Sequence, residues 1–496
     1  MNLIIKFSKF EKYTKYSIFV IIIFSVIVFY LTSIYHVSGD GCWHIPAGKF
    51  IAENIKFPLF EPLGRDEPFW SPPLYHILVA AVYSVFNAFS HDAANFAVKF
   101  ISPIFGILSL IFLFLIIKKL VNSRIAFYST IFLAFVPIFI DYSVLEYVES
   151  TLVFFVVLSI YYLINDRILL SGIAAGLAIL TKYNGLFILP LLLYILYIKS
   201  KTKKILYKNA GVIILLPLLI SSPWLIRNWV LLGNPIWPFL NFIFHGYAPK
   251  SYSAANFSHL FHPNTIIFTY LGIFGVPDGN YHSLTFANFQ NLQYLLAIWL
   301  LVTFIFFIPL IFGFLTKFKQ RKLFSIWIIP FILLFFLYVI NVGWSVSRII
   351  LPAFPALAVF WALGYEKSIA ISKLKIIKAA FILVVIGLVS AESIKVNFAA
   401  NSWNVYREDF EWVKSNTNQN AVFIANGQCV PYNIERKSLY VTDENLKYAE
   451  YIWINQNFNL DKRSILDDQE LNSILSKNYK IVYNNKNTGT AIYSTR

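Results

Sequence analysis

The chain has 496 residues, of which 58% are hydrophobic and only 13% are charged. A soluble protein needs a far larger charged fraction on its surface, so this composition excludes an ordinary soluble domain. Apolar runs long enough to cross a bilayer recur along most of the sequence, which predicts a polytopic α-helical membrane protein.

The formal net charge of +16 comes largely from short basic loops between the apolar runs. The basic residues gather in KFSKFEKYTK, KKLVNSR, KSKTKKILYK, TKFKQRK and EKSIAISKLK. This distribution follows the positive-inside rule and indicates cytoplasmic loops rather than a surface for nucleic acid. We therefore expect a cytoplasmic N-terminus and no nucleic-acid partner.

The first apolar run, 16–35, is too long for a cleaved signal peptide and lacks a cleavage site, so we interpret it as a retained span. The short run 74–89 would invert every later loop if it crossed the bilayer, so we expect an interfacial helix on the outer surface. The other spans bring the total to about eleven. They are expected at 95–117, 125–145, 150–165, 168–181, 185–199, 209–226, 292–315, 323–342, 349–365 and 375–392.

The sequence changes character after about residue 397, where charge and asparagine rise and long apolar runs stop. YREDFEWVKSNT reads as an amphipathic helix, and AVFIA, KIVYNN and TAIYST read as short strands. The pattern predicts a transmembrane domain over 1–397 and a small external α/β domain over 398–496. Two external segments, 36–94 and 233–291, are expected within the first domain.

The chain has two cysteines, Cys42 and Cys429, and no CxxC motif, so neither a zinc site nor a redox motif is indicated. Both cysteines are expected on the outer side. A disulfide between them is one alternative, and two unpaired thiols are the preferred interpretation.

The ionisable residues that are not cytoplasmic anchors fall on the predicted outer face. Alone, each has an ordinary explanation as a turn aspartate, a solvated glutamate or a snorkelling cation. However, charges at membrane depth are costly and usually face a cavity, and the positive-inside rule disfavours outer cations. These residues therefore predict a site that faces outward. They are Asp40, Glu146, Glu149, Lys182, Arg227 and Arg348.

The residue types in this set indicate a chemistry. Cations beside apolar surface suit a lipid phosphate, and a carboxylate facing them suits a general base. Further candidates that stack on a sugar, orient the base or contact the substrate are Trp43, His44, Trp70, Tyr183 and Asn228. There is no P-loop and no dinucleotide fingerprint, so the pattern favours sugar transfer from a polyprenyl phosphate without a nucleotide.

With these residues, the membrane portion (about 16–365) resembles the GT-C glycosyltransferases, specifically the protein O-mannosyltransferase and lipid A aminoarabinose transferase superfamily. The resemblance rests on the order of WSPPLYH, SGIAAGLAILTKYNGLFILP, PWLIRNWVLLGNPIWP and SRIILPAFPALAV. It implies a GT-C fold and an inverting transferase that uses a polyprenyl-phosphate-linked monosaccharide. It further implies that Asp40 is the base, that Glu149 is the second acidic position and that the cations Lys182, Arg227 and Arg348 bind the lipid phosphate.

Two positions depart from the family pattern. Gly41 stands where the family often has a second acid, and Ser71 stands where some members have a phosphate-binding lysine. These departures leave open a divalent metal, for which the long segment 233–291 offers histidines. The histidines of this segment are His245, His259, His262 and His282. On one interpretation they are ordinary loop residues, and on the other they include a metal ligand.

The sequence therefore predicts a plasma-membrane glycosyltransferase with no certain cofactor. Its expected partners are a polyprenyl-phosphate sugar donor, a protein or glycolipid acceptor and the surrounding membrane lipid. A transporter or flippase of lipid-linked glycans is the main alternative, but it predicts inverted repeats, which the sequence lacks. A non-catalytic subunit of a glycan assembly complex is the second alternative.

Overall fold

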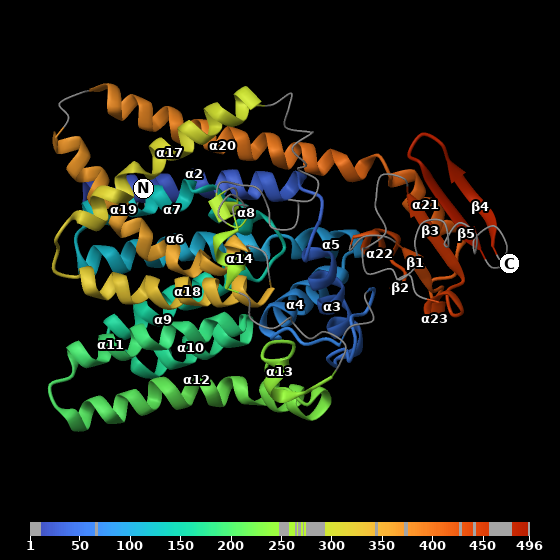
Figure 1. The fold of residues 1–496 in the computed structure, drawn as a ribbon, viewed down its shortest axis with the longest axis horizontal. Coiled ribbons are helices and arrows are strands. Elements are labelled where there is room, and N and C mark those ends of the chain that lie inside the picture. The colour runs from blue at the N-terminus through green and yellow to red at the C-terminus, as the bar shows by residue number, and fades with distance from the viewer. Residues whose placement is uncertain are drawn as a thin grey trace.

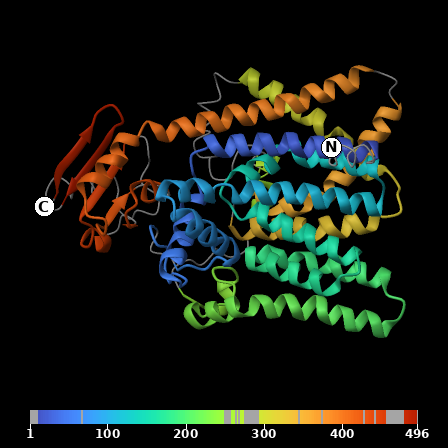
Figure 2. The ribbon, with the colours of Figure 1, turned by 180° about the vertical axis from the view of Figure 1, so that it is seen from behind.

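The computed structural model of the chain combines a bundle of long helices with a small sheet at one end (Figure 1). The described residues are 11–64, 68–247, 257–262, 265, 269–270, 272–273, 293–342, 346–371, 375–425, 429–439, 443–455 and 479–494. Figure 2 shows the same arrangement from behind: the long helices run side by side, and the sheet lies beyond one end of the bundle.

Every predicted span coincides with a helix or a pair of helices. Five helical segments of the described chain are long and apolar enough to cross a membrane, or six if a bent pair counts as one span. The helices are α2 (Lys12–Ile34), α5 (His91–Val98) and α6 (Ile101–Leu120), α7 (Ser123–Phe135) and α8 (Pro137–Val144), α9 (Glu149–Ile164), α10 (Ile168–Thr181), η1 (Tyr183–Ile188) and α11 (Leu189–Lys199), α12 (Lys203–Leu232), α17 (Gln293–Leu315), α18 (Arg321–Val342), η3 (Ser347–Ala353) and α19 (Phe354–Ile371), and α20 (Lys375–Asn404).

The bent pair is α7 and α8, whose axes differ by 63°. Pro137 begins α8, and a proline ends the preceding helix because it has no N–H to donate. The bend leads into α8, where Asp141 accepts a hydrogen bond at 2.7 Å from Lys395 of α20. This ion pair, which the sequence analysis did not identify, joins α8 to the helix that leads to the C-terminal sheet.

The bundle core is apolar and rich in aromatic rings. Phe132 of α7 stacks on Phe306 of α17 at 5.4 Å between ring centroids and lies 5.3 Å from Trp361 of α19. Elsewhere the packing depends on small residues: a Cβ at Gly176 of α10 would lie 2.9 Å from the Cβ of Ile220 of α12. Such close approach is typical of helices that pack within a membrane.

The two ends of the bundle differ. The short turns 121–122, 165–167, 200–202 and 316–320 lie at one end, and they include or adjoin the basic stretches of the sequence (Figure 1). At the other end, α3 (Gly41–Asn54), α4 (Leu74–Asn87) and α5 lie between the bundle and the sheet (Figures 1 and 2). The basic loops thus share one end, as the charge pattern predicts.

Helices α3 and α4 pack closely against each other. Gly48 of α3 faces Val79 of α4, and a Cβ at residue 48 would lie 2.3 Å from the nearer methyl carbon of that valine. The side chains of His44 and His76 meet across the same interface. The pair therefore forms one unit that carries residues 40–54 at the end of the bundle.

The C-terminal part is a five-stranded mixed sheet in the order β2-β1-β3-β5-β4, with β1 parallel to both neighbours and β5 antiparallel to both. Its elements are α21 (Arg407–Asn416), β1 (Phe423–Ala425), α22 (Val430–Ile434), β2 (Ser438–Leu439), α23 (Asp443–Leu446), β3 (Tyr451–Asn455), β4 (Lys480–Asn485) and β5 (Thr490–Ser494). The sequence patterns predicted α21, β1, β4 and β5 and missed the other four.

Cys42 of α3 and Cys429 before α22 form a disulfide, across a sequence separation of 387 residues. The expectation of two unpaired thiols is therefore wrong. The sequence could not indicate this pairing, because it depends on how the sheet domain packs against α3.

The α3–α4 contact yields a matched pair of glycine substitutions. We expect Gly48→Ala to destabilise the protein by about 1–3 kcal/mol, because the methyl group has no space between the helices. Gly211→Ala in α12 is the control, since a Cβ there meets nothing within 4 Å and alanine favours a helix by up to about 1 kcal/mol. Thermal unfolding of the two variants in detergent tests this, and equal melting temperatures would contradict it.

Candidate active site

Asp40 lies in a tight turn between α2 and α3. Gly39 has φ +55°, a left-handed conformation that favours glycine, and a Cβ there would overlap the hydroxyl of Tyr147. The same hydroxyl accepts a hydrogen bond from the backbone N–H of Asp40 at 2.9 Å. The sequence analysis missed Tyr147, although it lies between the two predicted glutamates. Its role is to hold the backbone of the turn.

Four of the predicted charged residues converge at this turn. The Arg348 guanidinium donates a hydrogen bond to Asp40 Oδ2 at 2.5 Å, and the Lys182 ammonium donates one to Glu149 Oε1 at 2.6 Å. Arg348 Nε lies 3.8 Å from the same Glu149 oxygen, so the two pairs form one cluster. We call these four residues the charged cluster.

The cluster has an exposed side and a buried side. The side chains of Asp40, Lys182 and Arg348 are 26%, 25% and 19% exposed, whereas that of Glu149 is 2% exposed. Glu149 therefore lies on the buried side of the cluster, where it contacts both cations. A buried carboxylate is costly unless it is paired, and here the two cations provide the pairing.

Each member of the cluster lies at or near the end of a structural element. Asp40 precedes α3, Glu149 begins α9, Lys182 separates α10 from η1, and Arg348 lies in the first turn of η3. Because helices of alternating direction bring these ends to one end of the bundle, residues 308 positions apart become neighbours. The Arg348 guanidinium also lies over the ring of Tyr147, with 5.2 Å between Cζ of Arg348 and the ring centroid.

His44 and Trp43 lie beside the turn on α3. The His44 Nδ1 atom is 2.9 Å from Nε2 of His76 on α4, and both rings are buried. Burial lowers the pKa of His76 to about 3 and that of His44 well below its ordinary value, so both rings are neutral at pH 7. The Trp43 ring packs against the His44 ring, with 3.9 Å between the ring centroids, and Trp43 remains partly exposed.

Arg227 does not join the charged cluster. Its guanidinium stacks on Trp224 and donates hydrogen bonds to the carbonyl oxygens of Phe69 at 2.9 Å and Pro58 at 2.7 Å. It therefore ties α12 to the segment that connects α3 with α4. Any contact of Arg227 with a lipid phosphate would have to replace these bonds.

Tyr183 and Asn228, also predicted as site residues, meet at the backbone of Trp70. The Trp70 carbonyl accepts hydrogen bonds at 3.2 Å from the Tyr183 hydroxyl, the Asn228 amide and the Trp224 indole. The Asn228 amide also donates to the Tyr183 hydroxyl at 2.9 Å. Since Tyr183 follows Lys182 directly, this network holds the chain beside the charged cluster.

Glu146 lies under the turn rather than on the surface of the site. Its side chain is 0% exposed, and a Cβ at Gly41 would lie 3.1 Å from its Oε2 atom. Burial raises the pKa of Glu146 to about 7, against the opposing charge of Lys99. The side chain thus occupies space that Gly41 leaves open, and a substrate contact would require it to move.

The described residues contain no group of three or more His, Cys, Asp or Glu side chains that could hold a metal ion. Among the loop histidines, His245 follows α13 (Asn241–Phe244), and His259 and His262 lie in and after α14 (Ser258–Phe261). His282 and much of the segment 233–291 lie outside the described residues.

Comparison with known families gives one match within the chain. Residues 70–227, from the segment before α4 to α12, match a family described as dolichyl-phosphate-mannose-protein mannosyltransferase. This stretch includes Glu149, Lys182, Tyr183 and Arg227 but neither Asp40 nor Arg348. A search of curated protein sequences found no significant match.

Solved structures resemble the chain over nearly its whole length. ArnT from Cupriavidus metallidurans, in the apo state, superposes with a TM-score of 0.62 at 12% identity, covering 97% of this chain and 98% of ArnT. ArnT bound to undecaprenyl phosphate gives 0.59 at 12% identity over the same shares of the chains. An Archaeoglobus fulgidus oligosaccharyltransferase tethered to an acceptor peptide gives 0.59 at 14%, covering 90% of this chain and 70% of that one.

These matches confirm the predicted resemblance to the GT-C glycosyltransferases, and the chain has the GT-C fold. The family match and the fold together support transferase activity and a membrane location.

Glu146 gives a prediction of pH dependence. A carboxyl whose pKa rises to about 7 on folding binds its proton more tightly in the folded protein, so its contribution to stability is lost as pH rises from about 4.5 to 7. We expect Glu146→Gln to melt above the wild type by an amount that grows between pH 5 and pH 8, corresponding to up to about 3 kcal/mol. A difference between Glu146→Gln and wild type that stays constant from pH 5 to pH 8 would contradict the interpretation.

Lys182 gives a prediction of coupled stability. We expect Lys182→Met to destabilise the protein by about 2 kcal/mol, because the buried Glu149 loses its nearest cation. The double variant Lys182→Met/Glu149→Gln should recover most of that loss, since no buried charge is then left unpaired. Thermal melts of the two single variants and the double variant measure the coupling, and additive effects would contradict the pairing.

Proposed function

We propose that the chain is an integral membrane glycosyltransferase that transfers a monosaccharide from a polyprenyl-phosphate donor to a hydroxyl acceptor, with inversion at the sugar carbon. The observation that carries this proposal is the charged cluster, in which Asp40 lies 2.5 Å from Arg348 and Lys182 lies 2.6 Å from Glu149. The cluster combines a partly exposed carboxylate with two partly exposed cations. Such a set can supply both a general base and a binding site for a leaving phosphate.

Asp40 is the proposed general base. Its carboxylate takes the proton of the acceptor hydroxyl while the acceptor oxygen bonds to the anomeric carbon of the donor. The bond from that carbon to the phosphate oxygen breaks, and its electron pair leaves with the polyprenyl phosphate. Attack opposite to the leaving group inverts the anomeric centre, so the reaction needs only one displacement.

Lys182 and Arg348 are the proposed phosphate contacts. Both already pair with a carboxylate, and the four charged side chains sum to zero formal charge. A donor phosphate would add negative charge and compete with Asp40 for the Arg348 guanidinium. Donor binding would thereby release the Asp40 carboxylate towards the acceptor hydroxyl, while Glu149 keeps both cations in place from below.

The neighbours of the cluster suit a sugar. Trp43 is partly exposed beside His44, and Trp70 is partly exposed beside the ring of Phe239 at 5.8 Å. Aromatic faces of this kind stack on sugar rings. Arg227 and Asn228 take a supporting role in this proposal, because Arg227 binds the Phe69 carbonyl and Asn228 binds the Trp70 carbonyl.

The solved neighbours support a lipid-phosphate donor. The ArnT structure at 97% coverage of this chain contains undecaprenyl phosphate, and an archaeal oligosaccharyltransferase covering 89% of it contains an inhibitory peptide and a dolichol-phosphate. The proposal extends this donor class to the present chain. It also keeps the predicted orientation, with the charged cluster and the sheet domain outside the plasma membrane and the basic loops in the cytoplasm.

Asp40→Asn tests the proposal. The amide keeps the size of the side chain but cannot take a proton, so we expect transfer to fall by about 10²- to 10⁴-fold. The assay uses purified protein in vesicles that contain membrane acceptors. The labelled donors are polyprenyl-phosphate mannose and a panel of other polyprenyl-phosphate monosaccharides. Label in protein or glycolipid measures the rate.

The matched control is Asp166→Asn, which changes an exposed aspartate paired with Lys199 at the basic-loop end of the bundle. This variant should transfer at the wild-type rate. Unchanged transfer by folded Asp40→Asn would remove Asp40 from the mechanism. Absence of transfer by wild type from every donor would favour the transporter or subunit alternatives.

A further inference from the structure

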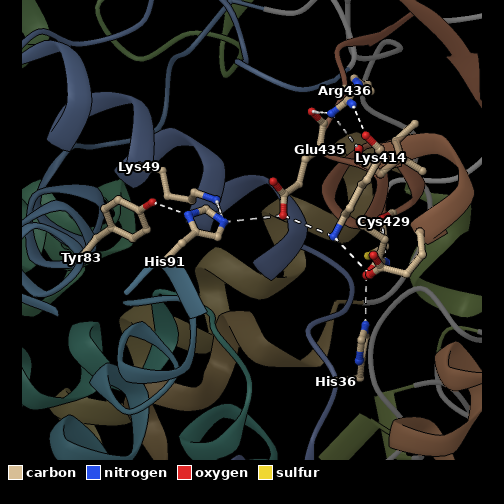
Figure 3. Close-up of polar contacts among 11 residues, drawn as sticks. His36, Lys49, Tyr83, His91, Lys414, Cys429, Glu435 and Arg436 are labelled. Carbon is tan, nitrogen blue, oxygen red and sulfur yellow. Dashed lines mark hydrogen bonds and ion pairs between the residues drawn. The ribbon is translucent and has the colours of Figure 1, made fainter. Parts of the chain in front are cut away.

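The sheet domain is attached to the segment that carries Asp40. Cys429, at the start of α22, is bonded to Cys42, two residues after Asp40. His36, four residues before Asp40, lies 3.0 Å from the Asn433 side chain of α22 (Figure 3). The turn therefore meets the same short helix of the sheet domain on both sides of the aspartate.

A second group of contacts lies farther along the same interface. His91 of α5 lies 3.6 Å from Glu435, which also pairs with Lys414 at 3.4 Å (Figure 3). The Tyr83 hydroxyl and the Lys49 ammonium approach the two nitrogens of the same His91 ring at 2.9 and 3.5 Å. These side chains hold the domain against α3, α4 and α5.

The Asp40 turn is supported from two sides. Gly39 and Gly41 flank the aspartate and provide no side chains that could pack. From the bundle side, the Arg348 guanidinium binds the Asp40 carboxylate, the Tyr147 hydroxyl accepts from the Asp40 N–H and the Glu146 side chain fills the space at Gly41. From the opposite side, the disulfide holds the first turn of α3. The position of the carboxylate relative to Arg348 thus depends on supports from two separate parts of the chain.

We propose that the Cys42–Cys429 disulfide is a positioning element for Asp40, so that the C-terminal sheet domain is a required part of the active site. This inference rests on the proposed function. The two cysteines touch no reacting atom and act through the backbone of the turn. Reduction by two electrons and two protons would convert the bond into two thiols, and the first turn of α3 would lose its covalent connection to the sheet domain.

The sheet domain should remain docked without the disulfide. The Ser438 N–H donates a hydrogen bond at 3.0 Å to the carbonyl of Leu63, and the contacts of Glu435 and Asn433 are independent of sulfur chemistry. Loss of the bond should therefore loosen the turn locally rather than unfold the interface. A misplacement of a reacting group by about 1 Å can lower a rate about 100-fold, so a small shift of Asp40 is sufficient.

The experiment compares wild type with Cys42→Ala/Cys429→Ala in the sugar-transfer assay. We expect kcat to fall about 10- to 100-fold while KM for the donor changes less than about twofold, because Glu149 still holds Lys182 and Arg348. A water-soluble phosphine reductant should lower the wild-type rate to that of the double variant. The same reductant should leave the double variant unchanged.

The matched control is Glu435→Gln, which weakens docking of the sheet domain without releasing the turn. This variant should keep at least half of the wild-type kcat. Equal losses in Glu435→Gln and the double cysteine variant would overturn the proposal, because they would indicate general docking rather than positioning of Asp40. Wild-type activity in the double variant would also overturn it.

A second readout does not depend on activity. Hydrogen exchange of backbone amides in residues 37–46 should become at least about tenfold faster in the double variant, with little change in β3 and β5 of the sheet. If wild type transfers no sugar, the proposed function fails, and the exchange measurement still decides whether the disulfide restrains the turn. Unchanged exchange in residues 37–46 would overturn the positioning role.

Discussion

The ion pair between Asp40 and Arg348 is the contact on which the arrangement of the site depends. It joins the turn after the first long helix to a 3-10 helix near the end of the bundle, with an N–O distance of 2.5 Å. Glu149 extends the pair to Lys182, so the cost of placing four charges at the end of an apolar bundle is offset within one group. The charged cluster therefore connects the elements that end there, and it is also the proposed centre of the reaction.

The sequence was sufficient to predict the helices and to place the members of this cluster at one end of the bundle. Long apolar runs determine helices in a membrane, and loop charge determines which helix ends lie together, so Asp40, Glu149, Lys182 and Arg348 could be assigned to one end in advance. The fates of Arg227 and Glu146 could not be predicted. Both depend on the direction in which a side chain points, which a sequence pattern does not specify. Arg227 points to the Pro58 and Phe69 carbonyls, and Glu146 points into the space beside Gly41.

Arg227 also illustrates how a charge can serve a backbone. The described residues between α3 and α4, 55–64 and 68–73, have little regular structure, so their carbonyl oxygens need donors from elsewhere. The Arg227 guanidinium, the Asn228 amide and the Trp224 indole of α12 supply them. A cation on the predicted outer face, where the positive-inside rule disfavours it, is therefore explained by hydrogen bonding to the main chain. The same departure at Arg348 is explained by a carboxylate.

The distance along the chain between the two cysteines has a consequence for the order of assembly. Cys42 is synthesised early, but its partner follows 387 residues later, after the whole helical bundle. During synthesis the contacts of the Asp40 turn with Tyr147, Glu146 and Arg348 can form first, and the support from the sheet domain arrives when that domain folds onto α3. A chain that stopped before the sheet domain could still form the charged cluster but would lack this second support, so we expect it to hold the proposed base less precisely.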